Sequence, residues 1–455
     1  MERSDRELSF LVAMFEGGGN IPLILPILSR LVARGNRVKV VAGASIRRPG
    51  VISPSDAFLE RIRATGASVA RLVEPASHPL PGAAPRGLVL GWTPRRFTSG
   101  LAFKGIDLAL ITRWSAAWAE GMAGEVARES PDVVVADFFL FGALAAGEGA
   151  GLPTAALVHN ASLFWPIPGR PPPGSGFGPA RNWRERLRDA VWVAAWRHVA
   201  VRDGLECVND ARGRVGLTPL RSPYQQYESA TRLLILGSEA FDFPWGRLPV
   251  NARYVGTPFD EVTPPDWVSP WPPDDPAPLV LVSLSTLPQG QGPVMHQILA
   301  ALDGMAVRAL VTLGPSLNPL DFTAPFNVRL ESFAPHAAVL PHVAAVVTQC
   351  GLSTVTKALA RGVPLVCLPV IDEQRENAAR IEALGAGIRL DPSAIPDQIR
   401  TALARVLHEP RFREAARRMA VELAGSNGAD VAATELESLA PASGAPFEVT
   451  AHRGP

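Results

Sequence analysis

Cysteine and lysine are both scarce in this 455-residue chain. Its three cysteines, Cys207, Cys350 and Cys367, lie far apart and form no CxxC pair. This number and spacing argue against a disulfide framework and a zinc site, and they are typical of a reducing compartment. Only three of the 44 basic residues are lysines, and the formal net charge is +1. The chain therefore lacks the basic field of a nucleic-acid-binding protein.

Long apolar segments are absent as well. The most apolar stretch of helical length, residues 190–201, contains Arg197 and His198. No run approaches the roughly 18 apolar residues of a membrane span. The apolar residues 8–15 are followed by Glu16 and three glycines instead of a signal-peptide cleavage site. We therefore expect no membrane span and a cytoplasmic location.

Apolar residues are nevertheless abundant and alternate between strand-like and helix-like segments. Hydrophobic residues make up 47% of the chain, which excludes a mainly disordered protein. Residues 8–15 form an apolar run, residues 21–33 carry apolar residues at helical spacing, and residues 38–42 form a second run. This unit predicts a parallel sheet with helices on both faces. The pattern continues with strands at 133–136, 154–158 and 233–236, and helices at about 143–150 and 183–215.

A proline-rich segment, residues 258–278, interrupts this alternation and predicts an interdomain linker. Beyond it, strands are expected at 279–284, 308–313, 328–331, 344–348 and 365–368, and helices at 294–301, 353–360 and 377–384. The fold class is therefore α/β, with two Rossmann-like doubly wound domains facing a ligand-binding cleft. We assign residues 1–257 to the N-terminal domain and 279–440 to the C-terminal domain. Its last helices should pack back on the first domain, and residues 441–455 should form a flexible tail.

The most informative stretch follows the strand predicted at 344–348. Gly351 ends this strand, and Ser353 and Thr354 stand at the start of a helix. The first amides of a helix are unpaired and its dipole is positive there, so this turn is a candidate anion site. The simpler alternative is that Ser353 only caps the helix.

Together with residues 362–369 and 372–380, this stretch resembles the donor-binding signature of the family 1 nucleotide-sugar-dependent glycosyltransferases, which have the GT-B fold. That family includes plant secondary-metabolite and bacterial macrolide glycosyltransferases. Further matches cover most of the chain, at residues 34–38, 253–256, 282–286 and 332–336. The resemblance implies that the N-terminal domain binds an acceptor and the C-terminal domain binds a nucleoside-diphosphate sugar. It also implies that no metal is needed and that the nucleotide sugar is a co-substrate.

The resemblance assigns most donor-side residues. It implies that Phe333 stacks on the base and that His336 occupies the place of a usual glutamine. Ser285 and Thr286 lie in the loop that reaches the diphosphate, and Gly351, Ser353 and Thr354 form the diphosphate-binding turn. Glu373 and Gln374 replace the usual Asp-Gln pair that binds hydroxyls of the transferred sugar.

Two donor-side positions depart from the family. Gln349 replaces a diphosphate-binding histidine; it can donate a hydrogen bond but carries no charge. Lys357 replaces a glutamate that binds the ribose hydroxyls, and a cation cannot accept those hydrogen bonds. A dTDP-sugar, which lacks the 2′-hydroxyl, would explain this change. The alternative is that the donor is a UDP-sugar and that Lys357 is a surface residue at a position where the family motif has changed without functional consequence.

The position of the general base departs as well. Asn20 stands where the family has its catalytic histidine, and asparagine cannot act as a base. It either caps the following helix or hydrogen-bonds to the acceptor. Asp137 and His159, each at the end of a predicted strand, are the candidate bases; the alternatives are a helix cap and a bond to a loop carbonyl. Trp165 lies on the acceptor side, in the Pro- and Gly-rich residues 160–182, which we expect to form a long surface loop.

We therefore predict an inverting glycosyltransferase that moves a hexose or deoxyhexose to a small, largely apolar acceptor, such as a secondary metabolite. The chain is a possible homodimer. Because several polar positions of the family have changed, two alternatives remain. One is a non-catalytic binding or auxiliary protein, and the other is a different GT-B enzyme, such as a sugar-nucleotide epimerase.

Overall fold

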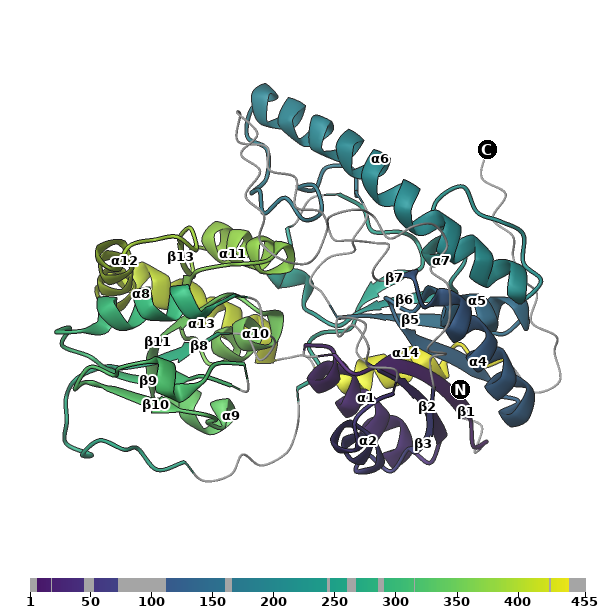
Figure 1. The fold of residues 1–455 in the computed structure, drawn as a ribbon, viewed down its shortest axis with the longest axis horizontal. Coiled ribbons are helices and arrows are strands. Elements are labelled where there is room, and N and C mark those ends of the chain that lie inside the picture. The colour runs from purple at the N-terminus through teal and green to yellow at the C-terminus, as the bar shows by residue number, and fades with distance from the viewer. Residues whose placement is uncertain are drawn as a thin grey trace.

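The structure is a computed structural model. It describes residues 6–17, 19–44, 53–72, 112–159, 166–243, 246–259, 267–284, 290–314, 316–424 and 427–441. Two α/β lobes lie side by side, and each contains one parallel sheet (Figure 1). The predicted fold class is therefore confirmed. Within the described residues, no helix is long and apolar enough to cross a bilayer.

The N-terminal sheet has seven parallel strands in the order β3-β2-β1-β4-β5-β6-β7. Its strands are β1 (Ser9–Phe15), β2 (Arg37–Gly43), β3 (Ser68–Arg71), β4 (Val133–Asp137), β5 (Thr154–Val158), β6 (Arg232–Ile235) and β7 (Ala252–Tyr254). Helices α1 (Ile21–Ala33) and α2 (Asp56–Arg63) pack on one face. Helices α4 (Ser115–Glu129), α5 (Phe141–Gly149) and α6 (Trp183–Arg214) pack on the other. The strand order reverses between β1 and β4, and such a switch point is where doubly wound folds bind ligands.

The C-terminal sheet has six parallel strands in the order β10-β9-β8-β11-β12-β13. They are β8 (Leu279–Ser283), β9 (Arg308–Thr312), β10 (Val328–Glu331), β11 (Val343–Thr348), β12 (Leu365–Cys367) and β13 (Gly387–Arg389). Helices α8 (Gly292–Leu302) and α12 (Pro396–His408) cover one face. Helices α10 (Leu352–Ala360), α11 (Asp372–Leu384) and α13 (Pro410–Ala424) cover the other. The short elements are α7 (Gln225–Glu228), α9 (His336–Val339) and the 3₁₀ turns η1 (Glu239–Phe241), η2 (Pro319–Asp321) and η3 (Leu340–His342).

The first strand–helix–strand unit follows from local sequence signals. All seven residues of β1 are buried, as expected for a strand covered on both faces. Helix α1 has a proline in its first turn, where no backbone donor is needed. Gly35 ends it in a left-handed conformation with φ of 82°, which costs a glycine no steric penalty. These signals place the polar residues that follow β1 at the carboxyl edge of the sheet.

The last helix, α14 (Gly428–Glu437), lies against α1 in the N-terminal lobe (Figure 1). Arg34 at the end of α1 donates hydrogen bonds to Asp430 and Glu437 at 2.8 and 2.9 Å. Gly428 passes so close to Thr257 that a Cβ atom would lie 2.5 Å from its carbonyl carbon. The chain therefore returns to the first lobe after completing the second.

Two sequence-based expectations are wrong in part. Residues 166–182 form a loop as expected, but residues 172–176 are buried instead of exposed because they dock against α11 of the other lobe. The helix expected at 377–384 begins five residues earlier, at Asp372, because Gln374 caps it. Its side-chain Oε1 accepts hydrogen bonds from the backbone N–H groups of Val370 and Ile371.

Candidate active site

Asp137 is the centre of a polar cluster at the carboxyl edge of the N-terminal sheet. It is the last residue of β4, and its side chain is fully buried. Oδ1 accepts a hydrogen bond from the backbone N–H of Phe139 at 3.1 Å. Oδ2 accepts one from Asn20 Nδ2 at 2.9 Å and lies 3.4 Å from His159 Nε2. Three strands thus bring together the three acceptor-side residues that the structure describes.

Asn20 occupies the N-cap position of α1, but its side chain does not cap the helix. The capping alternative is therefore wrong: the bonds that Nδ2 donates to Asp137 and to the carbonyl of Phe15 hold the amide in an orientation in which Oδ1 accepts no bond from the first turn. Asn20 is 1% exposed, and its Oδ1 has no hydrogen-bond partner among the described residues. A buried acceptor without a partner has a desolvation cost that a donor on a ligand can offset.

His159 follows β5 and is held between aromatic rings and Asp137. The edges of Phe138 and Phe139 approach its imidazole, with ring centroids 4.7 and 5.4 Å away. Its side chain keeps 11% of its surface exposed. If Nε2 carries the proton that faces Asp137, Nδ1 is the nitrogen that can accept one from an acceptor molecule. Nε2 lies within ion-pair distance of the Asp137 carboxylate but forms no hydrogen bond with the described residues, so the carboxylate acts on the imidazole through its charge.

The C-terminal lobe presents a sharp turn between β11 and α10. Cys350 has a left-handed backbone with φ of 71°, and its N–H donates to Thr348 Oγ1 at 3.2 Å. A non-glycine residue in this conformation costs about 1–2 kcal/mol, and such strain is concentrated at functional turns. Gly351, not Ser353, is the N-cap of α10, so the capping alternative for Ser353 is wrong. Ser353 and Thr354 lie half-buried in the first helical turn.

Glu373 and Asn377 brace this turn from α11. Glu373 Oε1 accepts the backbone N–H of Leu352, at the start of α10, at 3.3 Å. Asn377 Nδ2 donates to the same oxygen at 2.8 Å and to the carbonyl of Cys350 at 2.9 Å. Asn377 was not among the predicted site residues. Its spacing of four residues from Glu373 on one helix was the signal that places the two side chains together.

The remaining predicted donor-side residues lie around the same edge. Gln349 is 4% exposed, Lys357 is half-buried in the second turn of α10, and Phe333 is 77% exposed in the loop after β10. His336 begins α9, and its Nε2 lies 3.3 Å from Thr312 Oγ1. Burial, with a further contribution from Lys357, lowers the pKa of His336 to about 4. The imidazole is therefore neutral at pH 7. The predicted residues Ser285, Thr286 and Trp165 lie outside the described residues.

This half-buried histidine predicts a pH-dependent stability. Between pH 6.5 and 4 the unfolded chain binds a proton at His336 that the folded chain does not, so stability is complete above pH 6.5 and falls as the pH decreases. The difference of about 2.5 pKa units corresponds to about 3 kcal/mol of unfolding free energy. Urea unfolding at pH 7, 6 and 5 should show a smaller loss for His336→Gln than for the wild type. Equal losses in both proteins would contradict the assignment.

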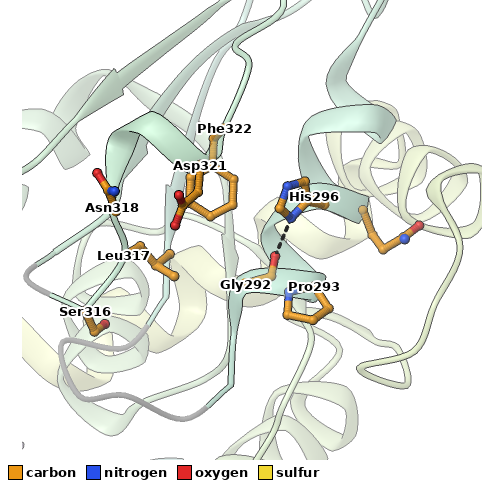
Figure 2. Close-up of a pocket in the computed structure, with 9 residues that line it drawn as sticks. Gly292, Pro293, His296, Ser316, Leu317, Asn318, Asp321 and Phe322 are labelled. Carbon is orange, nitrogen blue, oxygen red and sulfur yellow. Dashed lines mark hydrogen bonds between the residues drawn. The ribbon is translucent and has the colours of Figure 1, made fainter.

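A separate cavity of about 430 Å³ lies between the first turn of α8 and the segment around η2 (Figure 2). His296 forms part of its wall, with Nδ1 3.0 Å from the carbonyl of Gly292. None of the predicted site residues that the structure describes lines this cavity. In the described parts of the chain, no group of three or more His, Cys, Asp or Glu side chains is arranged to hold a metal ion.

Comparison with known proteins decides the family. Residues 296–439 match the family described as erythromycin biosynthesis protein CIII-like, C-terminal domain. Over 441 residues the chain is 31% identical to 4'-demethylrebeccamycin synthase of Lentzea aerocolonigenes, covering 94% of this chain and 99% of that protein. The chain belongs to the family 1 nucleotide-sugar glycosyltransferases. This glycosyltransferase is therefore an enzyme that transfers a sugar, as the sequence resemblance implied.

Solved structures agree with the fold of this glycosyltransferase. The calicheamicin glycosyltransferase CalG4 is 23% identical, with a TM-score of 0.68 over 95% of this chain and 98% of that one. The glycosyltransferase VinC, solved in complex with dTDP, is 18% identical, with a TM-score of 0.63 over 95% of this chain and 99% of that one. These similarities confirm the GT-B fold.

Proposed function

We propose that this glycosyltransferase moves a hexose or deoxyhexose, with inversion, from a nucleoside-diphosphate sugar to a small, largely apolar acceptor of secondary metabolism. The observation that carries the proposal is the buried carboxylate of Asp137 between Asn20 and His159 at the switch point of the acceptor-side sheet. The similarity to 4'-demethylrebeccamycin synthase supports an acceptor of this class. We place the reaction in the cytoplasm.

His159 is the proposed general base. Its Nδ1 takes the proton from the acceptor's O–H or N–H while the acceptor's lone pair forms the new bond to the anomeric carbon. The bond from that carbon to the diphosphate oxygen breaks on the opposite face, and its electron pair leaves with the nucleoside diphosphate, which gives inversion. The negative charge of Asp137 stabilises the resulting imidazolium. Asn20 Oδ1 is the proposed acceptor for a hydrogen bond from the bound molecule.

The proposed donor site is the turn between β11 and α10. The backbone amides at the start of α10, with Ser353 and Thr354, meet the diphosphate, and Lys357 adds a positive charge nearby. Gln349 contributes a neutral donor where the family has histidine. These groups are proposed to hold the leaving group without a metal ion, and the family resemblance adds Ser285 and Thr286, which lie outside the described residues.

The proposed nucleoside is deoxythymidine. His336, neutral at pH 7, and the exposed ring of Phe333 flank the base. Lys357 stands where the family binds ribose hydroxyls, and a cation offers no acceptor to a 2′-hydroxyl. The neighbouring structure of VinC with dTDP supports this choice.

Calorimetric titration of the purified protein with dTDP and UDP, each with excess EDTA, tests the donor site. We expect dTDP to bind about tenfold more tightly than UDP, a difference of about 1.4 kcal/mol, and EDTA to change neither value. Preference for UDP would overturn the deoxynucleotide assignment. If neither nucleotide binds below millimolar concentration, the donor site itself is wrong, and a non-catalytic binding protein becomes the better explanation.

A further inference from the structure

A buried ionic cluster joins the two lobes at the second half of α11. Asp242, which follows η1 in the N-terminal lobe, is at its centre, with a side chain that is 1% exposed. Its Oδ1 accepts a hydrogen bond from Arg380 Nε of α11 at 2.9 Å. Its Oδ2 accepts hydrogen bonds from Arg170 Nη1 and from the hydroxyl of Tyr254. We call these four residues the Asp242 cluster.

The charges of the cluster stabilise one another. Burial alone would raise the pKa of Asp242, but the guanidinium groups of Arg380 and Arg170 outweigh burial and hold it below its usual value. Arg380 is 3% exposed and lies over the ring of Phe243, 4.9 Å from its centroid. A buried arginine of this kind depends on its acidic partners, so the cluster fixes α11 to the N-terminal lobe.

The segment 166–182 adds contacts to the same helix and to β13 of the same lobe. The backbone N–H of Gly174 donates to Glu376 Oε1, and Arg389 Nη1 donates to the carbonyl of Gly176. Gly176 has φ of 64°, and a Cβ atom there would lie only 2.6 Å from the Cβ of Arg375. Figure 1 shows α6, which follows this segment, extending from the N-terminal lobe to a position above α11.

These contacts begin directly after the residues proposed to bind the sugar. Glu373 and Gln374 lie in the first turn of α11, and Arg375, Glu376 and Arg380 continue the same helix. Because a helix is rigid over three turns, the lobe that binds the acceptor determines where the first turn of α11 points. The sugar-binding turn is thus anchored on the acceptor side as well as on the donor side.

We propose that Asp242 is a positioning residue for sugar transfer: with Arg170 it holds Arg380, and through α11 it places Glu373 and Gln374 where the acceptor can reach the sugar. The inference rests on the proposed function of these two residues. It requires that loss of the cluster impairs transfer while nucleotide binding, which uses α10, is retained.

The test compares Asp242→Asn, Arg380→Lys and Arg380→Gln in the full chain. For Asp242→Asn and Arg380→Gln we expect kcat for transfer to fall at least fivefold, dTDP affinity to stay within twofold, and a larger fraction of donor to be hydrolysed by water. Arg380→Lys, which keeps the charge, should recover part of the transfer. Unchanged kcat and hydrolysis fraction, or a dTDP affinity that falls in parallel with kcat, would overturn the proposal.

Gly176→Ala provides a second variant that leaves every buried charge in place. Its methyl group should push the segment away from Arg375. We therefore expect kcat for transfer to fall while the affinity for dTDP is retained. Gly216→Ala is the matched control, because that glycine also has positive φ, 76°, but no atom lies within 4 Å of its Cβ position. Equal kcat values for the two alanine variants would contradict the inference.

Amide hydrogen exchange separates this inference from the proposed function. In Asp242→Asn the exchange protection factors of the amides of residues 374–380 should fall at least tenfold, whether or not the enzyme turns over a substrate. If the wild type transfers no sugar, the proposed function fails. The exchange result still shows whether the Asp242 cluster stabilises α11. Unchanged protection would refute the cluster's positioning of α11 even in an active enzyme.

Discussion

Replacing Asp137 by asparagine is expected to lower kcat by about 10²–10⁴-fold, the usual contribution of a positioned acid–base system. Asparagine keeps the shape of the side chain, so the bonds from Phe139 and Asn20 can persist in part. It cannot stabilise an imidazolium at His159, whose Nε2 lies 3.4 Å from the carboxylate. Initial rates at saturating donor and acceptor measure the loss.

His159→Gln should lose a similar factor, and the double variant should lose little more than either single one, because the two groups act as one unit. Asp132→Asn is the matched control. Asp132 precedes the same strand at its opposite end, where it accepts the backbone N–H of Ser9 at 2.8 Å. This substitution should affect stability alone and leave kcat within twofold of the wild type.

The acidity of the acceptor provides a further readout. An acceptor whose O–H or N–H is already acidic depends less on a base, so Asp137→Asn should lose less activity with such substrates. If Asp137→Asn retains more than a tenth of kcat with a weakly acidic alcohol, the carboxylate has no part in proton transfer. The base would then have to be sought elsewhere.

The second large effect is expected for Glu373→Ala, which should lower kcat/KM for the donor by about 100-fold. Loss of hydrogen bonds between a carboxylate and two sugar hydroxyls would cost about 3 kcal/mol, which equals that factor. The affinity for dTDP, which carries no sugar, should stay within threefold. Measuring both quantities separates contacts to the sugar from contacts to the diphosphate.

Two further variants complete this test. Glu373→Asp, which restores the residue usual in the family, should keep most of the activity. Glu422→Ala removes an exposed carboxylate on α13 and should change nothing. If Glu373→Ala weakens dTDP and the donor sugar equally, its main action is the bond to the N–H of Leu352, and the sugar assignment is wrong.

Local sequence patterns predict several of the long elements of this fold, although helices α2 and α4 have no counterpart among the expected elements. β1, α1 and β2 begin or end within one residue of their expected bounds, because an apolar run, a glycine break and a helical period mark each of them. β7 and β13 were missed because three residues are too few to show a period. The start of α11 was missed because its first turn is polar and its capping is done by Gln374.

The residues of the candidate site could be predicted from the sequence, but the contacts between them could not. Strand ends and motifs predicted Asp137, His159 and the turn at Gly351. Nothing local indicates that Asn20 bonds to Asp137 or that Cys350 is left-handed, because both depend on neighbours far away in the sequence. The burial of residues 172–176 depends in the same way on α11, since proline and glycine alone are typical of exposed loops.

Because α14 packs against α1, the N-terminal lobe can be completed only after the C-terminal lobe has been synthesised. Arg34 and its partner Thr434 are separated by 400 residues. At about 5–20 residues per second, α1 leaves the ribosome roughly 20–80 s before its partner. During that interval the side of α1 that packs against α14 in the native protein is uncovered. The first lobe therefore remains incomplete while the second folds. Closure of the first lobe over α1 therefore has to wait until α14 has been synthesised.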